Sequence, residues 1–487
     1  MDSVRVRMYS QGLGDCFLIT ATTGGVERHA LIDCGVLLGT PDATARMQEV
    51  AQDVLTTTGG HLDVLAATHE HWDHVGGFTL ARDLLARLSV GEVWLAWTEN
   101  PSDPAAGDLK SATARGVRAA TAAATALRDA NGDHADRLFG VLEFFGAATV
   151  PGGASPGGAS PGSASPGSAV PGGASPGSAG GGTTHAALEW VRGRSTTVRY
   201  LRPGQTVAAL GLQVYVLGPP TDRRYIRMSD PTAAANVYTI SGIGEDEGFL
   251  AAAEALETGE ESPMQPFDTF FRVDEEAAAT AFPLIGAEYR DPDQAWRRVD
   301  HDWLGAADVL ALNLDSNTNN TSLVLAFETG DGQFLLFPGD AQVGNWLSWQ
   351  TVTWTTPSGQ LTAPEVLART RLYKVGHHGS HNATLRDKGL ELMTSGDLVA
   401  MLPVNRETAR KQRWNMPLPG LLARLEEKTK GRVLDAETGL AQVKPSAVSD
   451  AEWADFVAAT TVVPGRYVDH VIHWEGVHPA VPDSHRQ

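Results

Sequence analysis

Cysteine is almost missing from this chain, because only Cys16 and Cys34 occur among 487 residues. Two thiols cannot form a disulfide framework, so the chain is not a small secreted scaffold held by cystines, and a reducing compartment is expected. Each cysteine lies within an apolar stretch, "GDCFLI" or "ALIDCG". Both are therefore expected to pack as small hydrophobic side chains on adjacent strands.

Long apolar runs are missing as well. No stretch approaches the about 18 consecutive apolar residues that a membrane helix needs. The opening stretch "MDSVRVRMYSQ" lacks the apolar centre of a secretory signal peptide. These two absences predict a cytoplasmic protein without a membrane partner.

Positive charge is in deficit, with 38 Lys and Arg against 58 Asp and Glu and a net charge of −20. Such a field repels nucleic acid at long range, so a polyanionic substrate would need a local basic patch. Residues 365–413 contain nine basic and five acidic side chains, a local net charge of +4. Lys374 is the candidate phosphate contact within this stretch, and Trp414 beside it is a candidate platform for base stacking.

The order of predicted elements indicates a mixed α/β fold. Strands are expected in 4–34, a helix over 44–58, a strand over 62–68, a helix over 77–88 and a strand over 90–99. Strand patterns return at 196–220, 308–314, 322–329, 333–340 and 371–375, followed by a helix over 418–430 and a last strand from 467. A strand pattern that occurs twice is typical of two facing sheets.

Two insertions interrupt this pattern. The first, 101–195, joins an Ala-rich helical part to a Pro/Gly/Ala/Ser linker at 151–182, whose six proline-containing pentamers can neither pack a core nor sustain a helix. The second, 221–305, is acidic. Residues 1–100 are therefore the first half of one domain, 196–220 and 306–475 are its second half, and 476–487 are a flexible tail. The insertions are candidate surfaces for a protein partner.

The stretch "HEHWDH" carries four metal-ligand side chains directly behind the apolar run "LDVLAA". Residues two apart on an extended chain point to the same side, so His69, His71 and Asp73 are expected to project together while His74 turns to the next position. Imidazole and carboxylate ligands suit zinc, manganese or iron. The loop is therefore predicted to bind metal.

Further ligands follow strands in the second half of the chain. Asp340 ends "FLLFPGD", where a carboxylate could bridge two metals, and His377 and His378 follow "LYKVG". Ligands at the same end of successive strands are what a two-metal hydrolase requires.

Taken together, these residues resemble the metallo-β-lactamase fold superfamily, and within it a soluble relative of the hydrolase domain of ComEC-type competence proteins. The matching stretches, in chain order over residues 11–381, are "GLGDCFLI", "ALIDCG", "LDVLAATHEHWDHVGG", "YVLGPP", "NNTSLVL", "FLLFPGDA" and "YKVGHHGS". The resemblance implies an α/β fold, the αββα four-layer sandwich, with two divalent metal ions at one edge of the sheets. Zinc is the expected metal and manganese the alternative.

The resemblance also implies roles for single residues. His69 and His71 would bind the first metal, and Asp73 and His74 the second. Asp340 would bridge the two, His378 would complete the second site in preference to His377, and Asp33 would orient the histidine loop.

The chain departs from the superfamily pattern at the first metal, where many members supply a third histidine. The candidates His134, His185 and His301 all lie in or beside insertions. Water or a polar side chain such as Asn320 is the other candidate, and a single-metal form stays open.

The expected chemistry is hydrolysis by a metal-activated water, with Asp73 holding the nucleophile and receiving its proton. Three functions stay open at this point. The first is a phosphodiesterase or nuclease, the second a hydrolase of small esters, thioesters, lactones or lactams, and the third a metal-bearing regulatory or partner-binding module. His381, close to the second ligand loop, is a candidate substrate contact.

Overall fold

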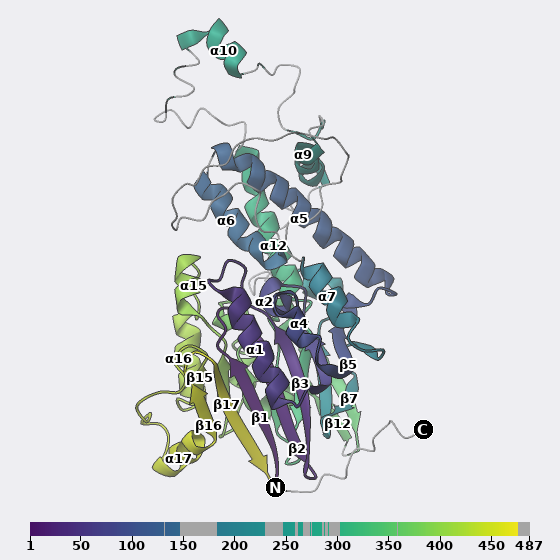
Figure 1. Ribbon diagram of the computed structural model, residues 1–487, viewed down its shortest axis with the longest axis vertical. Coiled ribbons are helices and arrows are strands. Elements are labelled where there is room, and N and C mark those ends of the chain that lie inside the picture. The colour runs from purple at the N-terminus through teal and green to yellow at the C-terminus, as the bar shows by residue number, and fades with distance from the viewer. Residues whose placement is uncertain are drawn as a thin grey trace.

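The computed structural model describes residues 1–130, 132–146, 183–228, 302–357 and 359–475, with short pieces between 247 and 291 (Figure 1). The linker at 151–182, His301 and the tail at 476–487 lie outside the described residues. Within the described part of the chain, no helix combines the length and the hydropathy needed to cross a membrane.

The first sheet has eight strands in the order β16-β17-β1-β2-β3-β4-β5-β6. Strands β3 to β6 run parallel, and β1 pairs antiparallel with both β2 and β17, so the two ends of the described chain meet in one sheet. Cys16 lies opposite Cys34, and both are buried free thiols, as expected from their apolar surroundings. The bounds are β1 (Asp2–Tyr9), β2 (Cys16–Thr23), β3 (Val26–Cys34), β4 (His61–Ala67), β5 (Ser89–Ala96), β6 (Val198–Leu201), β16 (Thr460–Val463) and β17 (Tyr467–Trp474).

The second sheet has seven strands in the order β15-β14-β13-β10-β9-β8-β7. Strands β10, β13, β14 and β15 run parallel and the remaining pairs are antiparallel. The bounds are β7 (Thr206–Ala209), β8 (Leu212–Gly218), β9 (Val324–Glu328), β10 (Phe334–Phe337), β13 (Thr370–Lys374), β14 (Val399–Leu402) and β15 (Val433–Asp435). A small ribbon of β11 (Thr353–Thr356) and β12 (Gly359–Thr362) stands apart.

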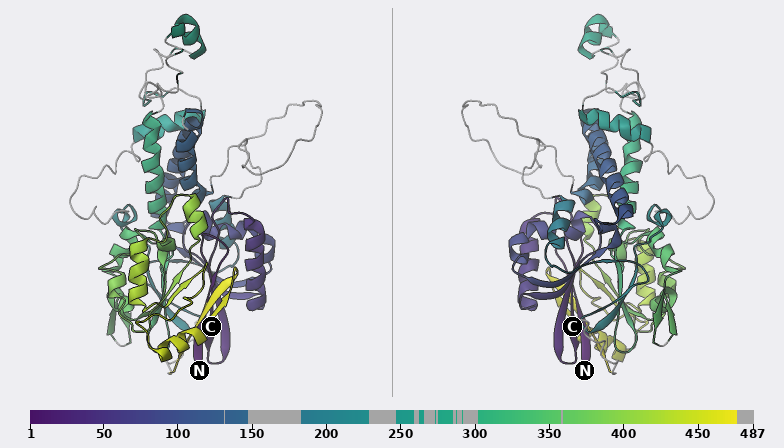
Figure 2. Two further views of the ribbon diagram at one scale, coloured as in Figure 1. Left: turned by 90° about the vertical axis from the view of Figure 1, so that its left-hand side faces the viewer. Right: turned by 90° about the vertical axis from the view of Figure 1, so that its right-hand side faces the viewer.

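The two sheets face each other across one core, in which Phe17 of the first sheet contacts Phe337 of the second. Helices cover the outer faces: α1 (Ala43–Thr57) and α7 (Thr184–Arg192) cover the first sheet. Helices α13 (Val343–Trp349), α14 (Ala363–Ala368) and α16 (Pro419–Lys428) cover the second (Figure 2). The mixed α/β class and the two facing sheets are thus confirmed. The expected helix over 77–88 is broken into α3 (Gly77–Leu80) and α4 (Arg82–Leu85).

A helical cap stands on one end of the sandwich (Figure 1). It consists of α5 (Pro104–Ala130), α6 (Gly132–Leu142), the short turn η2 (Glu143–Phe145), α9 (Glu247–Thr258) and α12 (Ala306–Asn319). These elements share one apolar cluster, which also takes in Leu13 and Leu37 from loops of the first sheet. The two insertions therefore meet in one structure, and Arg115 of α5 ties them together through an ion pair with Glu254 of α9 at 2.8 Å.

The strand expected at 308–314 is wrong, because these residues form part of α12. Leu310, Ala311 and Leu314 are buried, whereas Val309 and Leu312 are exposed. This spacing is the apolar stripe of a helix and not the alternation of a strand. Residues 306–319, expected in the second half of the domain, therefore pack with the helices of the cap.

Candidate metal centre

The predicted ligands come together at the carboxyl ends of parallel strands in both sheets. The histidine loop follows β4, Asp340 follows β10, and the paired histidines follow β13. The loop bends at His69 and Glu70, is extended at His71 and then turns into α2 (Trp72–Val75), so Asp73 and His74 lie in a helical turn. This differs from the continuous extended loop that alternation suggested. The tight packing explains why glycine occupies position 35, where a Cβ atom would lie 2.1 Å from the Asp73 carbonyl.

Four buried ligand atoms surround one point, and we call this group the cage. It consists of Asp73 Oδ2, His74 Nε2, Asp340 Oδ2 and His378 Nε2. His378 Nε2 is 3.0 Å from Asp73 and 3.7 Å from Asp340, while His74 Nε2 is 3.1 Å from Asp340 and 3.7 Å from Asp73. Ligands of a tetrahedral zinc ion at about 2.1 Å lie about 3.4 Å apart. The cage therefore has the size of a metal site.

Outer partners orient both histidines of the cage. His74 Nδ1 donates to Asp33 Oδ2 at 2.8 Å, and His378 Nδ1 donates to the carbonyl of Pro403 at 2.7 Å. Each Nε2 consequently turns a lone pair toward two carboxylate oxygens, which are themselves acceptors. Burial lowers the pKa of His74, but Asp340 and Asp73 outweigh it, and the pKa stands well above its usual range. In the absence of a metal, a proton has to take the place of the cation.

Asp15 is a candidate ligand that the sequence analysis missed, although it stands in the quoted stretch "GLGDCFLI". It is buried, and with His74, Asp340 and His378 it forms a group whose ligand atoms all lie within 4.8 Å of one another. Its carboxylate oxygens lie 3.8 Å from the Nδ1 atoms of His74 and His378. Asp15 therefore lies on the Nδ1 side of both imidazole rings, close enough to Asp340 that Lys374 pairs with both carboxylates.

Lys374, the candidate phosphate contact, lies inside the protein. Its side chain is buried, and its ammonium pairs with Asp15 and with Asp340 Oδ1, the latter at 3.0 Å, and donates to the carbonyl of Gly339 at 2.7 Å. Burial alone would lower its pKa, but the two carboxylates raise it above its ordinary value. Lys374 is therefore a fixed internal cation that offsets the acidic ligands.

A second group of ligand atoms lies beside the cage, and we call it the first subsite. His69 Nε2 and His71 Nδ1 are 3.1 Å apart. Thr68 donates its hydroxyl proton to Asp33, so its oxygen accepts from His69 Nδ1, which leaves the lone pair of His69 on Nε2. His71 Nε2 lies 3.9 Å from Asp315 Oδ1 of α12. Burial lowers the pKa of His71 to about 3, whereas burial and then Asp73 and Asp340 raise the pKa of Asp315 to about 8.

His378 is the member of the pair whose Nε2 atom belongs to the cage, whereas the hydrogen bonds of the His377 ring go to Gln342 and Ser380. The ring of His377 contacts Gln342 at 3.2 Å and Ser380 at 2.9 Å, and its backbone amide donates to Asp340 Oδ1. His377, His378 and Asp33 adopt left-handed φ angles of 43°, 53° and 57°. Such conformations cost free energy in non-glycine residues and persist where the surrounding contacts enforce them.

The remaining candidates lie elsewhere. Asn320 donates to the carbonyls of Ile226 and Met228 and accepts from the amide of Asn345, so it is occupied by backbone groups and does not complete the first subsite. His134 bonds to Asp308 at 2.8 Å within the cap, and His185 and His381 are exposed.

Aromatic residues of the cap lie against the first subsite. The ring of Phe145 is 5.0 Å from His71 and the ring of Phe144 is 5.5 Å from it. Trp414 stacks on Phe144 at 5.2 Å, so its indole extends this aromatic wall. The cap thereby covers the histidine loop, and the six ligands of the cage and first subsite are at most 1% exposed.

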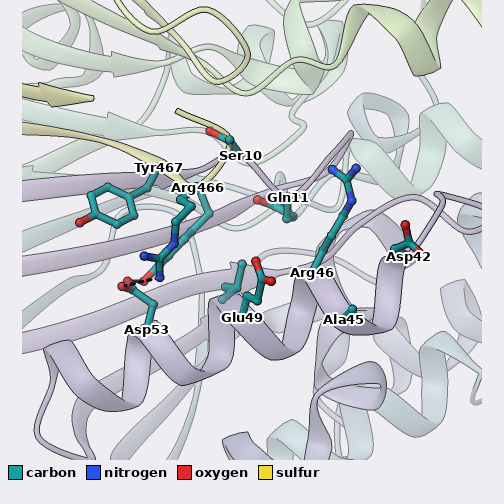
Figure 3. Close-up of a pocket in the computed structure, with 12 residues that line it drawn as sticks. Ser10, Gln11, Asp42, Ala45, Arg46, Glu49, Asp53, Arg466 and Tyr467 are labelled. Carbon is teal, nitrogen blue, oxygen red and sulfur yellow. Dashed lines mark hydrogen bonds and ion pairs between the residues drawn. The ribbon is translucent and has the colours of Figure 1, made fainter. Parts of the chain in front are cut away.

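A cavity of about 460 Å³ lies away from the ligands, between α1 and the strands β1 and β17 (Figure 3). Gln11, Arg46, Glu49 and Tyr467 line it, and Arg466 reaches across to Asp53 at 3.7 Å. Its lining contains charges of both signs and none of the cage residues.

Comparison with known proteins finds no match: no protein-family model matches the chain, and a search of curated proteins returns none. The geometry of the buried cluster therefore carries the functional argument.

Proposed function

We propose that this chain is a metal-dependent hydrolase of the metallo-β-lactamase fold. The observation that carries the proposal is the cage, in which four buried atoms from two sheets converge with the spacing of a tetrahedral metal site. Two facing sheets with helices on both outer faces agree with the αββα order of that fold. The order of the matching stretches along the chain supports the same family.

The residues fit the implied metals. Among the described residues, His74 Nε2 and Asp73 Oδ1 are buried and have no hydrogen-bond partner, which is costly unless a ligand satisfies them. Asp73, His74 and His378 would hold the second ion, His69 and His71 the first, and Asp340 would reach both. Zinc suits this donor set, with manganese as the alternative.

When bound, such ions lower the pKa of a coordinated water toward neutrality and stabilise the negative charge that develops on the attacked group. Asp73 would orient and deprotonate that water. Burial raises the pKa of Asp73, but His74 and His378 outweigh it and hold the pKa below its usual value, so the carboxylate is ionised at neutral pH. Its Oδ1, which no described residue contacts by a hydrogen bond, is free to accept the proton.

We propose phosphodiesters as the substrate class, and the protein as a nuclease or phosphodiesterase. The similarity of its motifs to the DNA-uptake branch supports this, and the Trp414–Phe144 pair offers aromatic surface beside the first subsite. Support from local charge is weaker than the sequence suggested. Lys374 is buried, and Arg371 and Arg406 are paired with Asp331 and Asp435.

A second candidate is a hydrolase of small ester, thioester, lactone or lactam substrates. The enclosure of the site favours it, because the cap leaves the ligands at most 1% exposed and a polymer would need a wide opening. The net charge of −20 also suits a small substrate better than a polyanion.

One assay separates the candidates. Purified protein with zinc or manganese is incubated with bis-(p-nitrophenyl) phosphate, single-stranded DNA, RNA, nitrocefin and a thioester panel. Turnover of phosphodiesters alone, lost in Asp73→Ala and kept in Asp331→Ala, supports the first proposal. Turnover of acyl compounds alone supports the second. A protein that binds metal and turns over none of these substrates would overturn both and favour a metal-bearing regulatory module.

A further inference from the structure

Two buried polar atoms at the first subsite face each other without partners. Among the described residues, neither His71 Nε2 nor Asp315 Oδ1 makes a hydrogen bond, and they are 3.9 Å apart. The other ring nitrogen of His71, Nδ1, faces His69 Nε2 at 3.1 Å. Because an unsatisfied buried donor or acceptor destabilises the folded protein, such a pair needs an explanation.

Asp315 is held in place from two sides. Asn319, one helical turn further along α12 and itself fully buried, donates from Nδ2 to Asp315 Oδ2 at 3.2 Å. The neighbouring Leu314 packs so closely on α5 that a Cβ atom at Gly116 would lie 2.8 Å from it. The free oxygen, Oδ1, is thereby left to face the histidine loop.

We propose that Asp315 is the positioning residue of the first metal subsite, accepting a hydrogen bond from His71 Nε2 so that His71 Nδ1 is left as the metal ligand beside His69 Nε2. An acceptor oxygen behind a ligating imidazole fixes the tautomer and the ring orientation, and the carboxyl group of Asp315 offers one. Closing the gap to hydrogen-bond length needs about 1 Å of side-chain movement. The inference rests on the proposed metal-dependent function.

This role makes the first subsite depend on the cap. The partner of His74 is Asp33, from β3 of the sandwich, whereas the partner of His71 comes from α12, an element of the cap.

The test counts metal ions. Wild type, Asp315→Ala, Asp315→Asn and His71→Ala are loaded with zinc, dialysed against metal-free buffer and analysed for ions per chain, and cobalt(II) is titrated while its visible absorption is followed. The matched control is Asp308→Asn, on the same helix, where the carboxylate bonds to His134 within the cap.

We expect two ions per chain in the wild type and in Asp308→Asn, and one in His71→Ala. Asp315→Ala should bind the first-subsite ion about 10–100-fold more weakly and keep the second. Asp315→Asn retains an acceptor oxygen, so its affinity for the first-subsite ion should fall between those of wild type and Asp315→Ala. A merely structural role of Asp315 would not produce this order.

Two results would overturn the inference. One is an Asp315→Ala protein that binds both ions with wild-type affinity although His71→Ala loses one. The other is an equal loss in Asp308→Asn, which would assign the effect to the integrity of the cap. A wild type that binds two ions but hydrolyses nothing would overturn the proposed function and leave the role of Asp315 intact.

Discussion

The two subsites of the candidate metal centre are built differently. The cage draws its four atoms from loops of both sheets, and Lys374 and Asp33 hold its members from behind. The first subsite has two histidines from one loop, and the facing carboxylate, Asp315, belongs to the cap. One subsite is therefore part of the sandwich, while the other is shared between sandwich and insertion. Substitutions in the cage should therefore change the free energy of unfolding more than substitutions in the cap.

The largest effect is expected when Asp340 is removed. Asp340→Ala takes one corner from the cage and leaves Lys374 buried with Asp15 as its remaining charged partner. Breaking a buried ion pair costs about 3–5 kcal/mol, and we expect the free energy of unfolding of metal-free protein to fall by that amount. Urea unfolding in the presence of a chelator measures it.

Its control is Asp331→Ala, which breaks a partly exposed ion pair with Arg371 and should cost less than about 1 kcal/mol. Equal losses in the two variants would show that the cage is no more tightly coupled to the fold than the surface is.

Chelation of metal should have the next largest effect. An ion present at 100 times its dissociation constant stabilises the folded state by about 2.7 kcal/mol. We expect thermal melting to shift upward on adding zinc to stripped wild-type protein, and the shift to be smaller in His378→Ala than in His71→Ala. The reverse order would place the stabilising ion in the first subsite and break the comparison.

The pH dependence of metal-free protein should separate the subsites further. The acidic ligands raise the pKa of His74 and His378 above the ordinary value despite burial. The stability that these two histidines contribute to the folded protein is therefore complete below about pH 6.5 and is lost as pH rises through the raised pKa values. Burial lowers the pKa of His71 to about 3 and of His377 to about 4, so stability is lost as pH falls from about 6.5 toward those values.

Urea unfolding between pH 5 and 9 in chelator should accordingly show greatest stability near the ordinary histidine pKa, at about 6.5. Bound metal replaces the protons of the cage. The difference in the free energy of unfolding between metal-loaded and metal-free protein should therefore increase above this pH. A difference that is constant with pH would contradict the assignment of His74 and His378 as ligands.

The smallest effect is expected in the cap alone. Arg115→Ala removes the ion pairs that join α5 to α9. Because the arginine side chain is partly exposed, the substitution should change the free energy of unfolding by less than about 1 kcal/mol. The ion in the cage should be retained, as elemental analysis would show. Loss of that ion would mean that the cap and the cage are coupled more strongly than their contacts indicate.

Much of the fold could be read from local patterns, and the exceptions have physical reasons. The strands around the histidine loop and before Asp340 have clear apolar runs bounded by turns, and both are strands in the structure. The stretch 308–314 is short and apolar, and such a run does not distinguish a strand from a helix. Packing against α5 and α6 in the cap decided in favour of a helix.

The amino-acid sequence by itself determined which side chains are available as ligands and that they follow buried strands, because strand periodicity and turns are local properties. Only the tertiary structure decided which ring nitrogen faces the cage, that Lys374 is an internal cation, and that Asp15 and Asp315 approach the site. These outcomes depend on contacts between residues tens to hundreds of positions apart. The residues next to a lysine or an aspartate in the sequence do not indicate which distant residue will neutralise its charge.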